Sequence, residues 1–360
     1  MNLFNEVIIG KIKSKNHFIR SATWENLATE TGHLTPPLSQ VYENLAKGAV
    51  GIIITGYANI LADEKPNAGM MGIYEDSFID EYKVLTDNIH KHGSKVVLQV
   101  AYGGTKTTYN IGERIIFAPS SIKEPSTGTL GKEMTKEEIK LVVEAFGESA
   151  RRAKASGFDG IEIHSAHTYL INQFLSPNLN KRTDEYGGNL ENRSRFLIEI
   201  YEAMREKVGL EFPIWVKITA TDFMDDGLKF NDVIEVCKKL EEIGVDAIEL
   251  SGNIHGKAKG MTGEVFDNFA IQKEGYFIEY AKELAKYVQL PIITVGGFSN
   301  LETINHVANS TSIKFFAISR PLLAEPNLIS RWQNGNVEKA KCVRCSKCRT
   351  PNGNYCVVFK

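Results

Sequence analysis

The sequence lacks the features that mark several specialised classes of protein. No apolar stretch reaches the roughly 18–20 residues that a membrane-spanning helix requires. The formal net charge is only −2, which gives no indication of a nucleic acid or an anionic membrane as a partner. The first residues also lack a basic start, an apolar segment and a small-residue cleavage site. We therefore expect a cytoplasmic protein that acts on small molecules, and the sequence leaves open whether it forms homo-oligomers.

Cysteine is scarce in the body of the chain, where Cys237 stands alone. The other four, Cys342, Cys345, Cys348 and Cys356, crowd together near the C-terminus. A secreted disulfide framework would spread its pairs, so this pattern indicates a local group of thiolates. The spacing C-x2-C-x2-C-x7-C can surround a 4Fe–4S iron–sulfur cluster or a zinc ion, and an empty site is the third alternative.

The sequence does contain a regular alternation of apolar and amphipathic segments. Eight short apolar runs occur, most of them followed by a segment with apolar residues at helical spacing. This alternation predicts parallel strands joined by helices, and eight units predict a closed (β/α)8 TIM barrel. An open doubly wound sheet is the weaker alternative, because no G-x-G-x-x-G follows the first run. The expected strands are Phe18–Ala22, Gly51–Thr55, Val96–Val100, Gly160–His164, Ile214–Thr219, Ala247–Ser251, Ile292–Val295 and Phe315–Ser319.

We assign residues 1–336 to the barrel and residues 337–360 to a cysteine-rich tail. Two connections, 57–75 and 102–134, are longer than most loops in compact domains, which favours a functional role. Both follow expected strands, so both should lie on the catalytic face of the barrel. The clearest helices by spacing are Asp76–Lys91, Thr135–Ala155, Asn189–Val208 and Asn231–Ile243.

Three polar side chains follow the fourth expected strand within a few residues: His164, His167 and Tyr169. A single histidine after a strand is more often a hydrogen-bonded core residue than a catalyst. Burying two imidazoles and a phenol together requires partners for all of them, which weakens a purely structural explanation. Because the carboxyl ends of parallel strands form the ligand site of such folds, we expect these side chains there.

The segment IEIHSAHTYLINQFLSP, followed by NKRTDEYGGNLENRSRF, resembles the signature of the Old Yellow Enzyme family of FMN-dependent oxidoreductases. The resemblance implies a barrel that binds FMN, takes electrons from NADH or NADPH, and reduces an activated C=C bond. It also implies that His164 and His167 donate to a substrate carbonyl oxygen, that His164 contacts the flavin as well, and that Tyr169 protonates the α-carbon. His255, after the sixth expected strand, matches a histidine that assists the tyrosine in some relatives.

Lys217 lies in the otherwise apolar strand WVKIT, and buried lysines are rare unless they are paired. An ion pair with Asp222 or Glu162 would explain it structurally, whereas the resemblance implies a cation beside the flavin ring. Gln99, in VVLQV, is implied as a second ring contact, with a core amide bonded to the backbone as the alternative. The resemblance places further ring contacts after the first two strands, at Ser21, Ala22, Thr23, Trp24, Gly56 and Tyr57.

A phosphate site is predicted from the loops that follow the last two expected strands. Gly296 and Gly297 follow the seventh, and Ser319 and Arg320 follow the eighth. In TIM barrels these two loops commonly bind a phosphate group. Glycines let backbone N–H groups approach the anion, and arginine supplies a forked cation. The order of the two loops therefore indicates a bound phosphate ester.

Two alternatives remain open. The first is oxidative removal of an alkyl group from an amine, a reaction of relatives with the same fold; the first cysteine spacings of the tail resemble those of amine dehydrogenases, in which the last gap is longer. The second is an FMN and iron–sulfur subunit that needs a separate partner. The charged segment 180–193 receives a structural assignment, in which Asn189 caps the next helix and Arg182, Asp184 and Arg193 form a salt-bridged loop.

Overall fold

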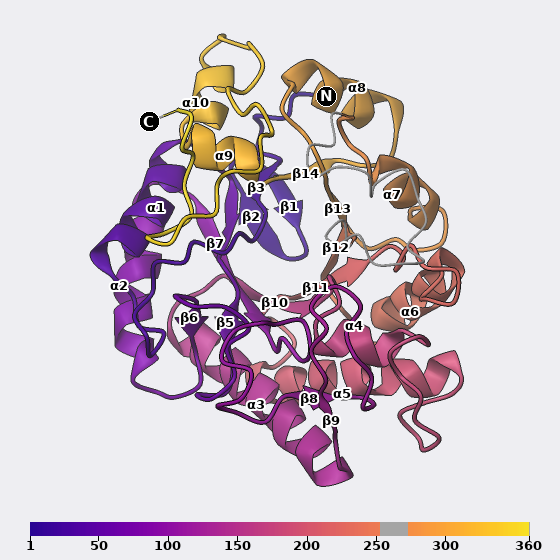
Figure 1. The fold of residues 1–360 in the computed structure, drawn as a ribbon. Coiled ribbons are helices and arrows are strands. Elements are labelled where there is room, and N and C mark those ends of the chain that lie inside the picture. Colours follow the sequence, from indigo (N-terminus) through magenta and orange to yellow (C-terminus); the bar gives the residue numbers. More distant parts are fainter. Residues whose placement is uncertain (253–272, 360) are drawn as a thin grey trace.

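The computed structural model describes residues 1–252 and 273–359. Within that part of the chain, parallel strands close into a barrel in the order β3-β4-β7-β10-β11-β12-β13-β14 and back to β3 (Figure 1). The predicted (β/α)8 TIM barrel is confirmed, and each barrel strand coincides closely with one of the eight predicted runs. The barrel strands are β3 (Phe18–Arg20), β4 (Ile52–Ile54), β7 (Lys95–Ala101), β10 (Gly160–Ser165), β11 (Ile214–Thr219), β12 (Ala247–Ser251), β13 (Ile292–Val295) and β14 (Phe315–Ile318).

Helices surround the barrel and bury one apolar face each against it (Figure 1). Thr135 and Glu138 form a reciprocal capping box at the start of α3, which satisfies two backbone N–H groups there. The longest helices, α3 and α5, pack side by side. The helices are α1 (Pro36–Lys47), α2 (Phe78–His90), α3 (Lys136–Ala155), α4 (Leu170–Leu175), α5 (Leu190–Val208), α6 (Phe230–Glu242), α7 (Ile278–Leu284), α8 (Leu301–Ser310), α9 (Arg320–Ala324) and α10 (Leu328–Gln333).

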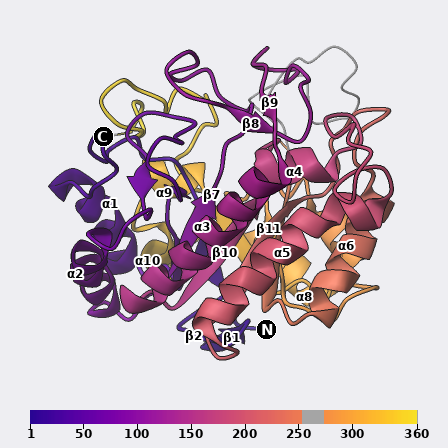
Figure 2. The same ribbon diagram turned by 90° about the horizontal axis from the view of Figure 1, so that it is seen from below.

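One end of the barrel is closed by an antiparallel hairpin of β1 (Val7–Ile9) and β2 (Ile12–Ser14). Ile9 and Ile12 of this hairpin pack against buried aliphatic side chains of the barrel strands and against Trp215. Figure 2 shows the hairpin at the end of the molecule opposite β8 (Phe117–Ala118) and β9 (Lys132–Glu133). The barrel is therefore open to ligands from the carboxyl ends of its strands, as is usual for this fold.

The two long connections contain short strands of their own. In the first, β5 (Ala58–Asn59) and β6 (Met71–Gly72) extend the sheet beyond β7. The second contains β8 and β9, which pair in parallel. The C-terminal tail returns to the carboxyl ends of the barrel strands. There the Ala340 N–H donates to the Ser299 carbonyl and the Asn354 N–H donates to the Glu25 carbonyl.

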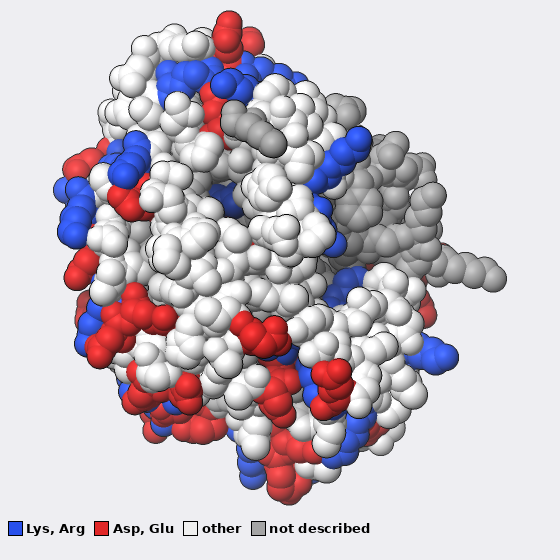
Figure 3. All heavy atoms as spheres, turned by 60° about the vertical axis from the view of Figure 1, so that its left-hand side comes forward, with Lys and Arg blue, Asp and Glu red and all other residues white. Residues whose placement is uncertain are grey.

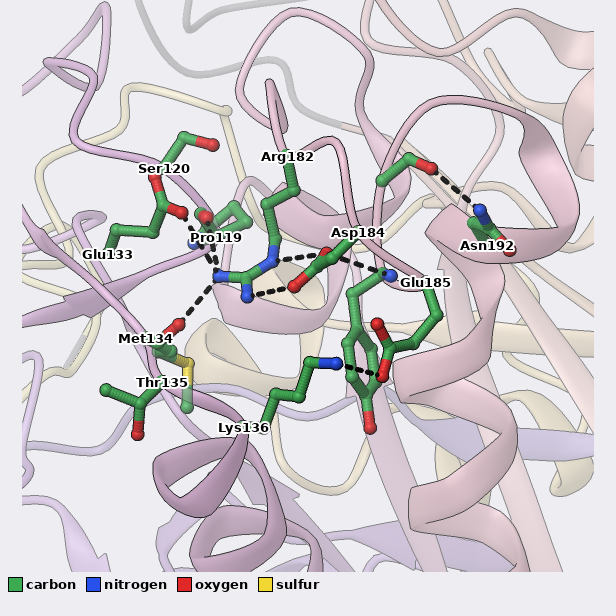
Figure 4. A network of polar contacts seen from close by, with 12 residues as sticks. Pro119, Ser120, Glu133, Met134, Thr135, Lys136, Arg182, Asp184, Glu185 and Asn192 are labelled. Atoms are coloured by element: carbon green, nitrogen blue, oxygen red, sulfur yellow. Dashed lines mark hydrogen bonds and ion pairs between the residues drawn. The ribbon is translucent and has the colours of Figure 1, made fainter.

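The charged segment 180–193 has the structural role that its sequence predicts (Figure 4). The Arg182 guanidinium pairs with Asp184 at 2.6 Å and donates to the backbone carbonyls of Pro119 and Met134. Asn189 caps α5 by accepting from the backbone N–H of Asn192. This network ties the second long connection to the start of α5. Arg193 also forms an ion pair, at 3.6 Å, with Asp232.

Candidate active site

A cavity of about 260 Å³ lies at the carboxyl ends of the barrel strands. The segment Ser21–Trp24 after β3 forms one wall, Lys217 lies on β11, and Ser319 and Arg320 follow β14. Ser346, Cys348, Arg349 and Asn354 of the tail complete the lining. Figure 3 shows a hollow on this side of the molecule, in which a recessed basic side chain lies among uncharged residues. The cysteine-rich tail is thus part of the site and not an appendage to it.

Lys217 is 3% exposed and borders this cavity. Its ammonium donates to Glu249 Oε1 and to Ser21 Oγ, both at 3.0 Å, and Ser21 Oγ donates to the same Glu249 oxygen at 2.7 Å. The structural alternative, an ion pair with Asp222 or Glu162, is replaced by a pair with Glu249, which lies opposite Lys217 in the register of β11 and β12. The lysine is therefore both paired and directed toward the cavity.

Gln99 does not border the cavity. Its amide donates to Glu162 Oε2 at 2.6 Å, and Gln99 and Glu162 pair in the register of β7 and β10. The side chain is 1% exposed. It is a core amide, as the structural alternative supposed, but it bonds a carboxyl group and not the backbone.

The two histidines form a chain of hydrogen bonds in place of a parallel pair. Burial, and next the charge of Lys217, lower the pKa of His164 to about 3, so its imidazole is neutral. Its Nδ1 accepts from the backbone N–H of Ala166, and the network therefore assigns the proton to Nε2. That Nε2 donates to His167 Nδ1 at 3.1 Å, and His167 Nε2 then lies 2.8 Å from Ser251 Oγ. His167 and Ser251 border the cavity, whereas His164 lies behind them.

The turn that carries these residues is conformationally unusual. His167 has a φ of 59° and Thr168 has a φ of 64°. Both angles fall in the left-handed region, which residues with side chains rarely adopt. Two such residues in succession cost free energy that the surrounding hydrogen bonds must offset. The backbone N–H of His167 donates to Thr219, and that of Thr168 donates to Asn172. The turn holds the His167 ring against the cavity wall.

Tyr169 is the N-cap residue of α4 and is stacked on His164, with ring centroids 4.6 Å apart. Tyr57 meets it edge-on at 5.5 Å, and Asn67 donates to the Tyr57 hydroxyl. Burial raises the pKa of Tyr169 to about 12, although a hydrogen bond from Tyr57 opposes the shift. The phenol therefore keeps its proton throughout the ordinary pH range.

The segment after β3 lines the cavity. Trp24 is held by a hydrogen bond from its indole to Ala68, and the Thr23 hydroxyl lies 2.9 Å from the Ser319 hydroxyl in the cavity lining. Ala22 also borders the cavity. Gly56, by contrast, lies away from it, and its N–H donates to the Tyr42 hydroxyl.

A second, smaller cavity of about 50 Å³ adjoins the first and is lined by Gly296, Gly297 and Arg320. Tyr276 and Ser319 border both cavities. A Cβ atom on Gly297 would lie 2.7 Å from the Lys273 carbonyl, and φ is 73° there. Only glycine fits such a position without strain. The predicted phosphate loops are thus brought together beside the main cavity.

The tail cysteines are free thiols, and all four are partly buried. Among the described residues, no group of three or more His, Cys, Asp or Glu side chains is arranged to hold a metal ion. Burial, and then the proximity of Cys342, Cys356 and Cys345, raise the pKa of the Cys348 thiol. The four cysteines therefore lie in one neighbourhood, although their described positions do not form a metal site. His255 lies outside the described residues.

Several residues at the site were not predicted from the sequence. Glu249 stands in the apolar strand AIELS, a signal of the same kind as Lys217 in its strand. Arg344, 5% exposed in the tail, donates to the Gly297 carbonyl at 2.6 Å and to Ser299. Neither Tyr276 nor Arg344 carries a sequence signal that would have placed it beside the phosphate loops.

Comparison with known proteins identifies the family of this chain. Residues 2–339 match the NADH:flavin oxidoreductase / NADH oxidase family. The chain belongs to this family. No helix within the described residues is long and apolar enough to cross a lipid bilayer.

Two curated relatives and one solved structure illustrate the likeness. An NADPH dehydrogenase of Geobacillus sp. (strain WCH70) is 34% identical over 325 residues, which are 90% of this chain and 91% of that protein. An NADH oxidase of Thermoanaerobacter brockii is 32% identical over 96% of this chain but only 53% of its own length. The old yellow enzyme homologue from Zymomonas mobilis has the same fold, with a TM-score of 0.80, 22% identity and 94% of each chain covered. The resemblance to the Old Yellow Enzyme family is confirmed. The chain spans about half the length of the first curated relatives it matches.

Proposed function

We propose that this protein is an FMN-dependent oxidoreductase that uses NADH or NADPH to reduce an activated C=C bond. The substrate class is an α,β-unsaturated carbonyl compound or an enoyl or dienoyl ester. Family membership supports a flavin enzyme that takes electrons from a nicotinamide nucleotide. The observation that carries the proposal is the cavity itself. An ammonium group lies at one side, an imidazole on the wall, and a glycine-lined second cavity with an arginine adjoins it.

The residues present fit FMN. Gly296 and Gly297 line the small cavity, and the Arg320 guanidinium beside them would supply the counter-charge of a phosphate group. Lys217 borders the main cavity and supplies positive charge where a flavin ring becomes electron-rich on reduction. When bound, FMN would accept a hydride from the nicotinamide and pass it to the substrate.

The protein's own residues would then orient and polarise the substrate. His167 Nε2 carries a proton and donates a hydrogen bond to Ser251 Oγ in this structure. A carbonyl oxygen that replaced Ser251 as the acceptor would receive the same hydrogen bond, which makes the β-carbon electrophilic. His164 fixes the tautomer of His167 from behind. Tyr169 holds its proton at the phenol oxygen and is the candidate proton donor, with His255 as its proposed assistant.

The position of the tail supports a role at the cavity. We propose that residues 337–360 act as a separate segment that closes the cavity, since Ser346 and Asn354 line it. A 4Fe–4S cluster or a zinc ion at Cys342, Cys345, Cys348 and Cys356 stays a prediction, and no step of the proposed reaction passes through it. Iron and zinc analysis of the purified protein tests it.

Turnover of contrasting substrates tests the proposed function. The protein, supplied with FMN and NADH or NADPH, is expected to reduce 2-cyclohexenone to cyclohexanone. Trimethylamine, offered with an artificial electron acceptor, is expected to give no turnover, because the His167 imidazole on the cavity wall is a hydrogen-bond donor suited to a carbonyl oxygen. Oxidation of trimethylamine without reduction of cyclohexenone would contradict the proposal and favour an amine dehydrogenase. Activity that appears only after another subunit is added would favour the partner-dependent alternative.

A further inference from the structure

Three neighbouring barrel strands each direct one charged side chain into the interior beneath the cavity. These are Glu162 on β10, Lys217 on β11 and Glu249 on β12, and their exposed fractions are 0%, 3% and 0%. TIM barrel interiors are usually filled with branched aliphatic residues. A buried charged cluster at this position is therefore an exception that needs a physical explanation.

The two carboxyl groups accept hydrogen bonds from different kinds of donor. Glu249 Oε1 accepts both from the Lys217 ammonium at 3.0 Å and from Ser21 Oγ at 2.7 Å. Glu162 Oε2 accepts from the neutral Gln99 amide, at 2.6 Å. Hydrogen bonds from a cation and a hydroxyl favour the ionised form of a carboxyl group. Glu249 is therefore the better-stabilised carboxylate of the two.

Two oxygens of the cluster have no hydrogen-bond partner among the described residues. Glu162 Oε1 and Glu249 Oε2 are fully buried, and neither accepts a hydrogen bond when both groups are treated as carboxylates. Two ionised carboxylates and one ammonium would also leave a net negative charge in the barrel interior, which is costly. The Glu162 and Glu249 side chains lie within hydrogen-bonding reach of each other, so one proton held between them removes both difficulties at once. In agreement, burial and next the charge of Glu249 raise the pKa of Glu162 well above its usual range.

We propose that Glu162 is a neutral carboxylic acid that donates to Glu249, and that Glu249 alone carries the charge that positions the Lys217 ammonium beside the cavity. Glu249 is thus a positioning residue that acts through Lys217, and its charge offsets part of the positive field that Lys217 exerts there. The flavin-related half of this inference rests on the proposed function. The assignment of the charges does not.

Unfolding in urea of the full chain without added FMN tests the charges. Glu162→Gln resembles a protonated carboxyl in shape and charge, so we expect the folding equilibrium constant to change by less than about fivefold. Glu249→Gln leaves the buried ammonium without its anion, and we expect the folding equilibrium constant to fall by at least about a hundredfold. Lys217→Met with Glu249→Gln removes both charges, and this double variant should recover much of that loss.

The comparison also holds if one variant fails to fold. If Glu249→Gln is insoluble while Glu162→Gln and the double variant fold, the assignment is supported. Equal damage from Glu162→Gln and Glu249→Gln would overturn it. Infrared difference spectra at about pH 9 give a direct readout, since Glu25 and Glu64, with pKa values of about 7, are ionised there. The carbonyl band of a carboxylic acid should be present in the natural protein and absent in Glu162→Gln.

The midpoint potential of bound FMN tests the flavin-related half. Glu249→Gln removes negative charge near the ring site and should favour the reduced form at least tenfold, which is about 30 mV for a two-electron couple. Glu162→Gln should leave the potential within about a third of that shift. A natural protein that binds no FMN would refute the proposed function and leave the urea comparison intact. If FMN binds and its midpoint potential is the same in both variants, only the positioning role of Glu249 is refuted, and the proposed function is not.

Discussion

Arg320 offers a way to test the phosphate site separately from the ring site. Its guanidinium lines both the main cavity and the small one beside Gly297, and it donates to Ser346 at 3.2 Å. A hydrogen bond to a charged group contributes about 1.5–3 kcal/mol. Because about 1.4 kcal/mol corresponds to a factor of ten, Arg320→Met should weaken FMN binding about 10- to 150-fold.

Riboflavin is the matched ligand, because it has the same ring without the phosphate. Quenching of flavin fluorescence gives both dissociation constants, and the riboflavin value should change by less than about threefold in Arg320→Met. Arg320→Lys keeps the charge but loses the fork, so its effect on FMN should be intermediate. Equal weakening of riboflavin and FMN would show that Arg320 supports the cavity wall and not a phosphate, and the account of the two cavities would be refuted.

Three further predictions address catalysis, backbone geometry and pH. Tyr169→Phe should slow the reduction of 2-cyclohexenone about 10²- to 10⁴-fold, while reduction of the flavin by NADH or NADPH in stopped flow stays unchanged; loss of both steps would contradict a proton-donor role. Gly297→Ala introduces a Cβ atom 2.7 Å from the Lys273 carbonyl at a φ of 73°, whereas Gly335 has a φ of 92° and no close neighbour. Gly297→Ala should therefore weaken FMN binding at least about tenfold and Gly335→Ala should not; equal effects would contradict the close approach at Gly297. Burial raises the pKa of Glu64 to about 7, so the folded protein binds more protons than the unfolded chain between the ordinary pKa of a glutamic acid and that value. The contribution of the protonated Glu64 to the free energy of unfolding is therefore complete in acid and is lost as pH rises toward 7. In urea unfolding, the stability of Glu64→Gln relative to the natural protein should increase over that pH interval; a stability difference that stays constant across pH would contradict the shift.

The barrel could be predicted because its signal is local. Runs such as Val96–Val100 and Ile214–Thr219 are largely apolar on both faces, as strands covered by helices and filled by a core must be. The phosphate loops could also be predicted, because their glycines and Arg320 directly follow strands whose order is set by the fold.

The partners of the buried charges could not be predicted, because they depend on strand register. Lys217 lies opposite Glu249 on one side and His164 on the other, whereas Glu162 lies opposite Gln99 and Trp215. Register is set by packing across the closed sheet and is not written in any one strand. The same limit explains why Gln99 was expected at the cavity.

The arrangement of the histidines and of the tail depends on contacts between distant segments. His164 is turned inward by the backbone N–H of Ala166 and by the left-handed turn at His167. The tail reaches the cavity because Asn354 bonds the backbone of Trp24 and Glu25, at the other end of the chain. Spacing of cysteines indicates a cluster, but it gives no indication of the surface on which the cluster lies.

The central claim is that a flavin lies in the cavity at the barrel mouth and is reduced there by a nicotinamide nucleotide. The visible spectrum of the purified protein, equilibrated with FMN and freed of excess, tests it most directly when recorded before and after anaerobic addition of NADH or NADPH. We predict a yellow protein whose flavin bands bleach on addition of one of the two nucleotides. A colourless protein, or a yellow one that neither nucleotide bleaches, would contradict the account.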